Sequence, residues 1–146
     1  MINKKSLFSF LIIIIFFVFL LLISKNNNFP NIKGLAIAGR NIKVELATMR
    51  AEQEKGLSGR SSLAPDEGML FVFSGGAPRF WMKDMNFPID MIWIGEDLRV
   101  VYIKKDARPE SYPETYGPAS TQGGPDREAK YVLEVMSGFA EKYNLK

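Results

Sequence analysis

The chain has 146 residues, no cysteine, no histidine and a formal charge of +3. The missing residue types exclude disulfides, thiol nucleophiles, imidazole bases and the usual zinc sites, so any chemistry must use carboxylates, lysine, tyrosine, hydroxyls or the backbone. Three of the 19 basic residues (Lys4, Lys5 and Lys25) flank an apolar segment, which leaves 16 basic against 16 acidic residues. This balance gives no reason to expect nucleic acid as a partner.

Residues 7–23, LFSFLIIIIFFVFLLLI, are apolar except for one serine. A helix of this length spans about 25 Å, at the short end of what crosses a bilayer. The run is longer than the core of a typical signal peptide, and 23–26 offers no small-x-small cleavage site. We therefore expect an uncleaved signal anchor over 1–25 rather than a cleavable signal peptide. The very short N-terminal tail favours a single-pass protein of the cell membrane, with its soluble domain on the extracytoplasmic side.

Residues 26–33 are a polar linker, and 34–146 are expected to form one β-rich domain. Short apolar or alternating runs separated by turn residues predict an antiparallel β-sandwich or barrel with one or two short helices. The stretch 105–126 contains four prolines and no clear periodicity, which is typical of a functional loop. The expected strands are 35–38, 42–47, 69–73, 80–85, 91–94, 98–104 and 131–136, and the expected helices are 49–55, capped by Thr48, and 139–145.

The stretch 80–94 contains both tryptophans, together with charged residues inside an apolar run. Because a buried charge is costly unless it is paired, these charges must reach solvent, pair with each other or hold a ligand. The candidate ligand-binding residues are Glu67, Trp81, Lys83, Asp84 and Asp90, with the 105–126 loop completing the pocket. Structural roles remain open for each of them: turn formation for Glu67, core packing for Trp81, an exposed position for Lys83, acceptance of backbone N–H groups for Asp84, and the cap of a turn for Asp90.

Four motifs in order resemble the domain of unknown function 192 family, with a helical entry motif before them. That resemblance implies a β-sandwich-like domain, often exported or membrane-tethered, and transfers no activity. Asp84 stands where the family usually has asparagine, Met136-Ser137-Gly138 replaces a usual Asn-Ala-Gly, and Lys146 comes before a closing segment that many members carry. The motifs are Pro65–Phe73, Phe80–Lys83, Pro88–Asp90 and Ala129–Val135, and the entry motif is Ala51-Glu52 followed by Lys55-Gly56-Leu57.

We therefore expect a membrane-anchored binding module for a small polar ligand, a glycan or an envelope partner protein. One alternative is a hydrolase or lyase that uses Glu67 and Asp90 as its two carboxylates. Another is a structural partner of a membrane protein, which would use an apolar sheet face. Calcium at Glu67, Asp84 and Asp90 is a weak alternative because their spacing fits no known loop, so no metal or cofactor is predicted.

Overall fold

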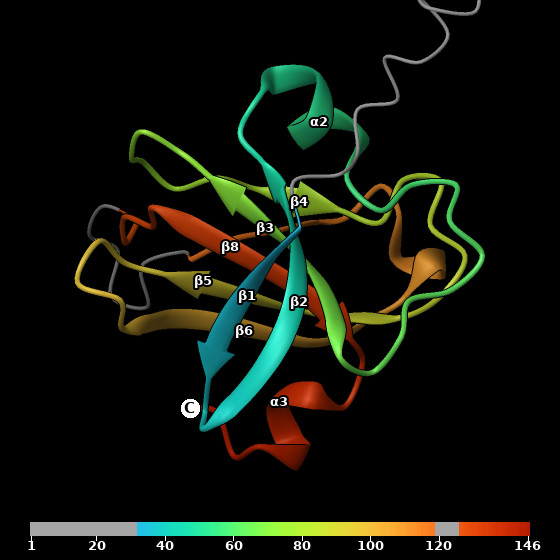
Figure 1. Cartoon of the computed structure of the whole chain (residues 1–146). Helices are drawn as coiled ribbons and strands as arrows, with labels where there is room; N and C mark the ends of the chain where they lie inside the picture. The colour runs from blue at the N-terminus through green and yellow to red at the C-terminus, as the bar shows by residue number, and fades with distance from the viewer. Residues whose placement is uncertain (1–31, 119–125) are drawn as a thin grey trace, which may run out of the picture.

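The computed structural model describes residues 32–118 and 126–146. Within them lie a six-stranded sheet, ordered β1-β2-β3-β8-β5-β6, and a separate two-stranded sheet of β4 and β7 (Figure 1). The strands are β1 Ile32–Ile37, β2 Arg40–Ala47, β3 Glu67–Val72, β4 Phe80–Trp81, β5 Ile89–Ile94, β6 Val100–Ala107, β7 Thr115–Tyr116 and β8 Tyr131–Met136. The helices are α2 Arg50–Lys55, the 3-10 turn η1 Pro109–Ser111, and α3 Phe139–Lys142.

The predicted anchor at 7–23 lies outside the described residues. In the part of the chain that the structure describes, every helix is too short or too polar to cross a bilayer. The first strand begins at Ile32, two residues inside the predicted linker.

The six-stranded sheet is mixed, which corrects the expected antiparallel topology. The strands β2 and β3 pair in parallel, whereas every other pair in this sheet is antiparallel. Parallel neighbours need a crossover connection, and residues 48–66, which include α2, provide it. Among the described residues the strand order runs from one edge, β1, to the other, β6, so no closed barrel is formed.

The central strands β8 and β5 are buried on both faces. Met91, Trp93 and Val132 belong to the apolar cluster on one face, whereas Ile92 and Leu133 belong to the cluster on the other. The second cluster is covered in part by α3, whose Phe139 is buried. Both faces of the central sheet are therefore covered.

The predicted strand at 80–85 is much shorter in the structure. Pairing with β7 stops at Trp81, and the amide of Met85 then donates to the carbonyl of Met82, which closes a turn. Asp84 within this turn has a φ of +55°, a left-handed conformation that a strand does not allow. Lys83 and Asp84 therefore project from a turn rather than from a strand.

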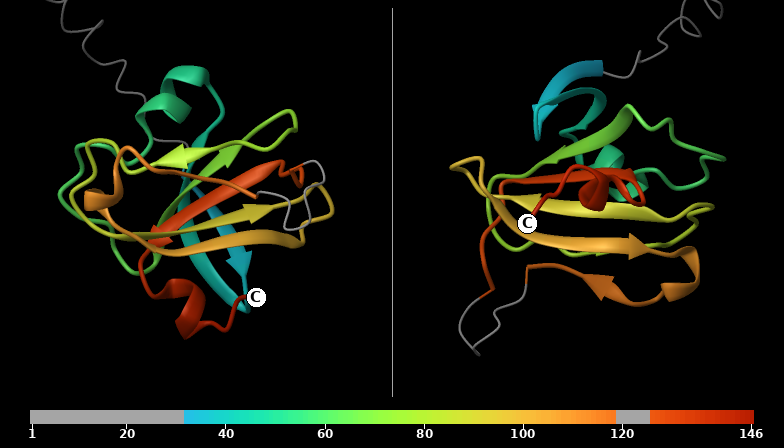
Figure 2. Two further views of the ribbon diagram at one scale, coloured as in Figure 1. Left: turned by 180° about the vertical axis from the view of Figure 1, so that it is seen from behind. Right: turned by 90° about the horizontal axis from the view of Figure 1, so that it is seen from below.

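The two helices lie at opposite ends of the six-stranded sheet. Figure 1 shows α2 beyond one end and α3 beyond the other, and the view from behind in Figure 2 shows the same separation. A group beside α2 and a group beside α3 thus occupy different regions of the molecule.

Candidate functional site

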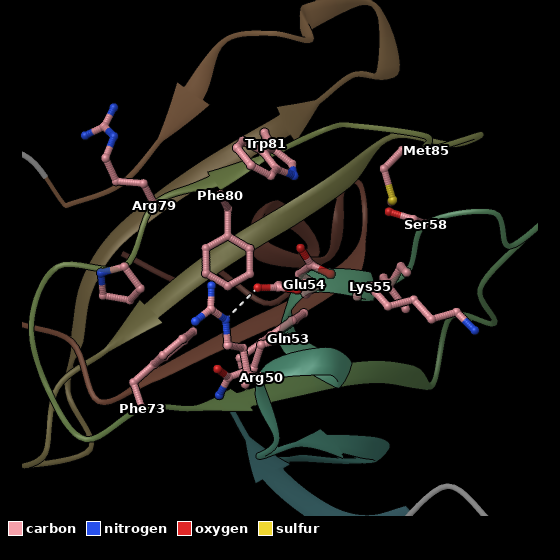
Figure 3. Close-up of a pocket in the computed structure, with 15 residues that line it drawn as sticks. Arg50, Gln53, Glu54, Lys55, Ser58, Phe73, Arg79, Phe80, Trp81 and Met85 are labelled. Atoms are coloured by element: carbon pink, nitrogen blue, oxygen red, sulfur yellow. Dashed lines mark hydrogen bonds and ion pairs between the residues drawn. The ribbon is translucent and has the colours of Figure 1, made fainter.

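A cavity of about 360 Å³ lies beside α2, within the size range of small-molecule sites. Its walls come from α2 and the loop after it, from β3 and the segment that follows, from β4 and from β8 (Figure 3). The lining residues are Arg50, Gln53, Glu54, Lys55, Gly56, Leu57, Ser58, Phe71, Phe73, Pro78, Arg79, Phe80, Trp81, Met85 and Glu134.

Polar contacts hold α2 in place, because none of its residues is buried. The carboxylate of Glu52 accepts the amides of Thr48 and Met49, each at 2.9 Å, and these bonds lower the pKa of Glu52. The helix therefore starts after Met49, and Thr48 supplies an N–H group rather than the predicted cap. The side chain of Gln53 donates to the carbonyl of Val72 at 2.8 Å, which ties the helix to the end of β3.

Gly56 ends α2 in a conformation that side chains rarely adopt, with φ +50° and ψ −137°. A Cβ at this position would lie 3.4 Å from Cζ of Phe71 and 3.9 Å from Oε2 of Glu134. These distances are ordinary contacts, so the positive φ, and not a lack of space, is what favours glycine at this point of the cavity wall.

Aromatic rings form another wall of the cavity, with Phe80 at their centre. Phe80 packs edge-to-face against Phe71 at 4.8 Å, against Trp93 at 5.8 Å and against Phe73 at 6.1 Å between ring centroids. The adjacent Trp81 is 53% exposed although it lines the cavity. An indole left half in solvent at a cavity can bind the apolar face of a ligand.

Glu134 is the buried ionisable group of the cavity. Its Cα partners are Met69 and Met91 on the flanking strands, and its side chain is 4% exposed. Its Oε2 has no hydrogen-bond partner, which is costly for a buried polar atom. Burial raises the pKa of this carboxyl to about 8, and the opposing charge of Arg60 lowers it only in part. Glu134 therefore carries a proton at neutral pH and can donate a hydrogen bond.

Arg60 does not neutralise Glu134, because it is engaged elsewhere. Its guanidinium forms a two-point ion pair with Glu45, with Nη2 donating to Oε2 at 2.7 Å. This pairing raises the pKa of Arg60 and lowers that of Glu45. Glu134 is thus left as an unpaired acid beside a satisfied salt bridge.

Of the five predicted site residues, only Trp81 lines this cavity. Glu67 closes a turn: its amide donates to the carbonyl of Ala64 at 3.0 Å, and its Oε2 accepts the amide of Ala64 at 3.3 Å. Lys83 and Asp84 are exposed, and their carbonyls accept bonds from Ser58 and Gly59. These three residues help to hold turns and loops in place.

Asp90 lies on the opposite face of the sheet from Glu134. It is 1% exposed; its Oδ1 accepts the amide of Asp106 at 2.9 Å, and its Oδ2 accepts the amide of Ala140 in α3 at 2.8 Å. Asp90 therefore has a structural role, but instead of capping a turn it joins β5 to the end of β6 and to α3. The structure does not gather Glu67, Lys83 and Asp90 around one hollow.

The predicted contribution of the 105–126 loop is also not seen at the cavity. As far as the structure describes the 105–126 loop, none of its residues lines the cavity; β7 instead supports it, because Thr115 accepts bonds from Arg79. The described residues contain no group of three acidic side chains that could hold a metal ion.

Sequence reasoning missed Glu134 and the residues of α2. The available signal was a lone glutamate in the apolar run Tyr131–Met136, at a strand position that alternation alone would assign to solvent. Only the central position of β8 shows that both of its faces are buried.

The fold and site define a mixed-sheet β domain with a ligand-sized cavity beside one buried acid. The chain belongs to the DUF192 family (Uncharacterized ACR), whose model matches residues 34–146. This confirms the resemblance seen in the motifs.

Two crystal structures are similar to the chain, each with a TM-score of 0.65. One is a protein from Sinorhizobium meliloti described as a "putative transcription regulator", with 30% identity over 79% of this chain and 85% of that one. The other is a protein of unknown function from Novosphingobium aromaticivorans, with 32% identity over 79% of this chain and 78% of that one. No curated protein matches the chain.

Proposed function

We propose that this chain is a membrane-anchored domain on the extracytoplasmic side that binds a small ligand in the cavity beside α2. One observation carries the proposal: Glu134 lines the cavity, is buried, and has a carboxyl oxygen without a partner. A ligand that hydrogen-bonds this group would recover part of the cost of burying it. The polar and aromatic walls suit a molecule with both hydrogen-bonding groups and an apolar face, such as a sugar.

A thermal-shift screen of the full chain in mild detergent tests ligand binding. The probes are D-glucose, N-acetyl-D-glucosamine, D-glucuronate, glucose 6-phosphate, glutamate and adenosine. A ligand at a hundred times its Kd stabilises the folded state by about 2.7 kcal/mol, which raises Tm by several degrees.

Trp81→Ala should abolish that rise, whereas Leu98→Ala should leave it unchanged. Leu98 is a suitable control because it is also a large exposed apolar residue, 73% exposed, and it does not line the cavity. No stabilisation by any probe, or equal losses in the two variants, would contradict the binding function.

The membrane location rests on the apolar run 7–23 and needs its own test. An alkaline-phosphatase fusion at the C-terminus should be active if the domain is extracytoplasmic. An inactive fusion, with the fusion protein present at normal levels, would contradict that orientation.

A second candidate function is glycoside hydrolysis. The observation that favours it is the protonated state of Glu134 at neutral pH, which a general acid requires, with the carboxylate of Glu54 also lining the cavity. Release of nitrophenol from 4-nitrophenyl glycosides, lost in Glu134→Gln but kept in Glu96→Gln, would support it. If sugars bind and none is hydrolysed, glycoside hydrolysis is contradicted and ligand binding remains as the function. The central strands are buried on both faces, which disfavours the alternative of an apolar sheet face that binds a membrane protein.

A further inference from the structure

The guanidinium of Arg50 has donors that the protein does not use. Its Nε donates to Oε1 of Glu54 at 2.7 Å, and its side chain is 91% exposed. Among the described residues it makes no other hydrogen bond, so its terminal N–H groups remain available. Figure 3 draws this guanidinium over the space between the rings of Phe80 and Phe73. The paired terminal nitrogens of arginine match the two oxygens of a carboxylate or phosphate.

The cavity wall carries more positive than negative charge. Three cations line it, Arg50, Lys55 and Arg79, against the one ionised carboxylate of Glu54, because Glu134 is neutral at neutral pH. In Figure 3 the charged ends of Lys55 and Arg79 extend outwards from the cavity. They raise the local potential for an anion, and Arg50 is the cation placed to contact it.

Two further features restrict the shape and polarity of the ligand. Trp81 presents a half-exposed indole, which suits the C–H face of a sugar ring. Glu134 presents a neutral acid, which can donate to an oxygen atom. A buried ionised carboxylate would repel an anion, whereas a neutral one can bind it.

Building on the proposed function, we propose that the ligand is an anionic sugar. Its ring stacks on Trp81, its carboxylate or phosphate pairs with Arg50, and the carboxyl group of Glu134 donates a hydrogen bond to one of its oxygens. Each of the three contacts uses a group that the chain itself leaves exposed or unpartnered.

This arrangement makes binding depend on the proton of Glu134. The charged groups around it are Arg50, Glu54 and Lys55 from α2, Arg79 before β4, and Arg60 with its partner Glu45. Burial raises the pKa of Glu134 to about 8, so the loss of its proton should weaken binding of the anion only above about pH 8. Above that pH, a ligand that binds only the protonated form loses about tenfold in affinity per pH unit.

Isothermal titration calorimetry of the full chain in mild detergent tests the inference. The probes are D-glucuronate, glucose 6-phosphate and D-glucose, each measured at about pH 6.5 and pH 9. At the lower pH at least one anion should bind tenfold or more tightly than glucose, and the comparison of the two anions tells a uronate from a sugar phosphate. The wild-type affinity for that anion should fall about tenfold at the higher pH.

Three variants separate the contacts. Arg50→Ala should lower the affinity for the preferred anion to the affinity for glucose. Arg99→Ala should have no effect, because Arg99 is a similarly exposed arginine that pairs with Asp97 away from the cavity. Glu134→Gln keeps a neutral donor, so it should bind the anion with equal affinity at both pH values. Glu134→Ala removes the donor and should bind the anion more weakly than Glu134→Gln at both pH values.

The outcomes distinguish this inference from the proposed function. Equal affinities for glucose and both anions, still lowered by Trp81→Ala, would overturn the anion requirement and leave a binding cavity in place. If only a probe without negative charge binds in the thermal-shift screen, the anion requirement is likewise overturned and the binding cavity remains. No binding of any probe would overturn both.

Discussion

Replacing Glu134 with glutamine tests the environment of the cavity, because it removes the titrating proton and keeps a similar side chain. Burial holds the pKa of Glu134 at about 8 in the folded chain, against an ordinary value of 4.5 for a glutamate carboxyl. Between these values the folded chain retains a proton that the unfolded chain releases, so the wild type loses stability as the pH rises from about 4.5 to about 8. At about 1.4 kcal/mol per pH unit, the whole interval amounts to about 5 kcal/mol.

The assay is denaturant unfolding of the wild type and Glu134→Gln at about pH 5 and about pH 8. The variant lacks this titration, so its stability relative to the wild type should rise by about 4 kcal/mol between the two conditions. Glu54→Gln is the control, because it changes an exposed carboxylate of the same cavity. Its stability relative to the wild type should change by no more than about 0.5 kcal/mol between the two pH values. If the relative stability of Glu134→Gln is the same at both pH values, the reasoning is refuted, since Glu134 would then ionise alike in the folded and unfolded chains.

Three further substitutions test the structural roles assigned to Asp90, Lys83 and Gly56. Asp90→Asn should cost about 2–4 kcal/mol in denaturant unfolding, because an amide cannot accept from both the Asp106 and Ala140 amides, whereas the exposed Lys83→Ala should stay within about 0.5 kcal/mol. Similar losses in these two variants would contradict the roles assigned to them. Gly56→Ala should cost about 1–3 kcal/mol, seen as a lower Tm, because alanine strains the backbone at φ +50°. An unchanged Tm would show that the end of α2 relaxes freely.

The strands were predictable where a run of apolar residues was bounded by turn residues. The last strand has the predicted limits, Tyr131–Met136, and α2 starts one residue later than expected and ends at Lys55 as predicted. The strand predicted over 80–85 was wrong after Trp81, because Met82 and Met85 are buried as parts of a turn and not of a strand. Apolar content alone cannot distinguish these two ways of reaching the core.

The sheet topology could not be predicted from the sequence, because parallel and antiparallel pairing are both compatible with the same alternation of apolar and polar residues. The parallel pairing of β2 with β3 depends on the crossover through α2, and nothing in the alternation of β2 shows which neighbour it takes. The order of the strands therefore had to come from the structure.

The site was only partly predictable. Trp81, one of the predicted site residues, lines the cavity and is half exposed, so the core-packing role that the sequence also allowed does not apply to it. Asp90 and Glu134 lie in similar apolar runs, yet one meets two backbone amides and the other meets none. The amides that Asp90 meets belong to Asp106 and to Ala140 in α3, which lie 16 and 50 residues further along the chain, so no local pattern could separate the structural acid from the unpaired one.

The central claim is that Glu134 is a protonated acid in the wall of a ligand-binding cavity. Carbon-13 NMR of the full chain labelled at the side-chain carboxyls of glutamate measures this directly, in the presence and absence of D-glucuronate. We predict one resonance that titrates near pH 8, disappears in Glu134→Gln and shifts when the sugar acid is added. A spectrum in which every glutamate titrates near pH 4 to 5, unchanged by the sugar acid, would contradict the account.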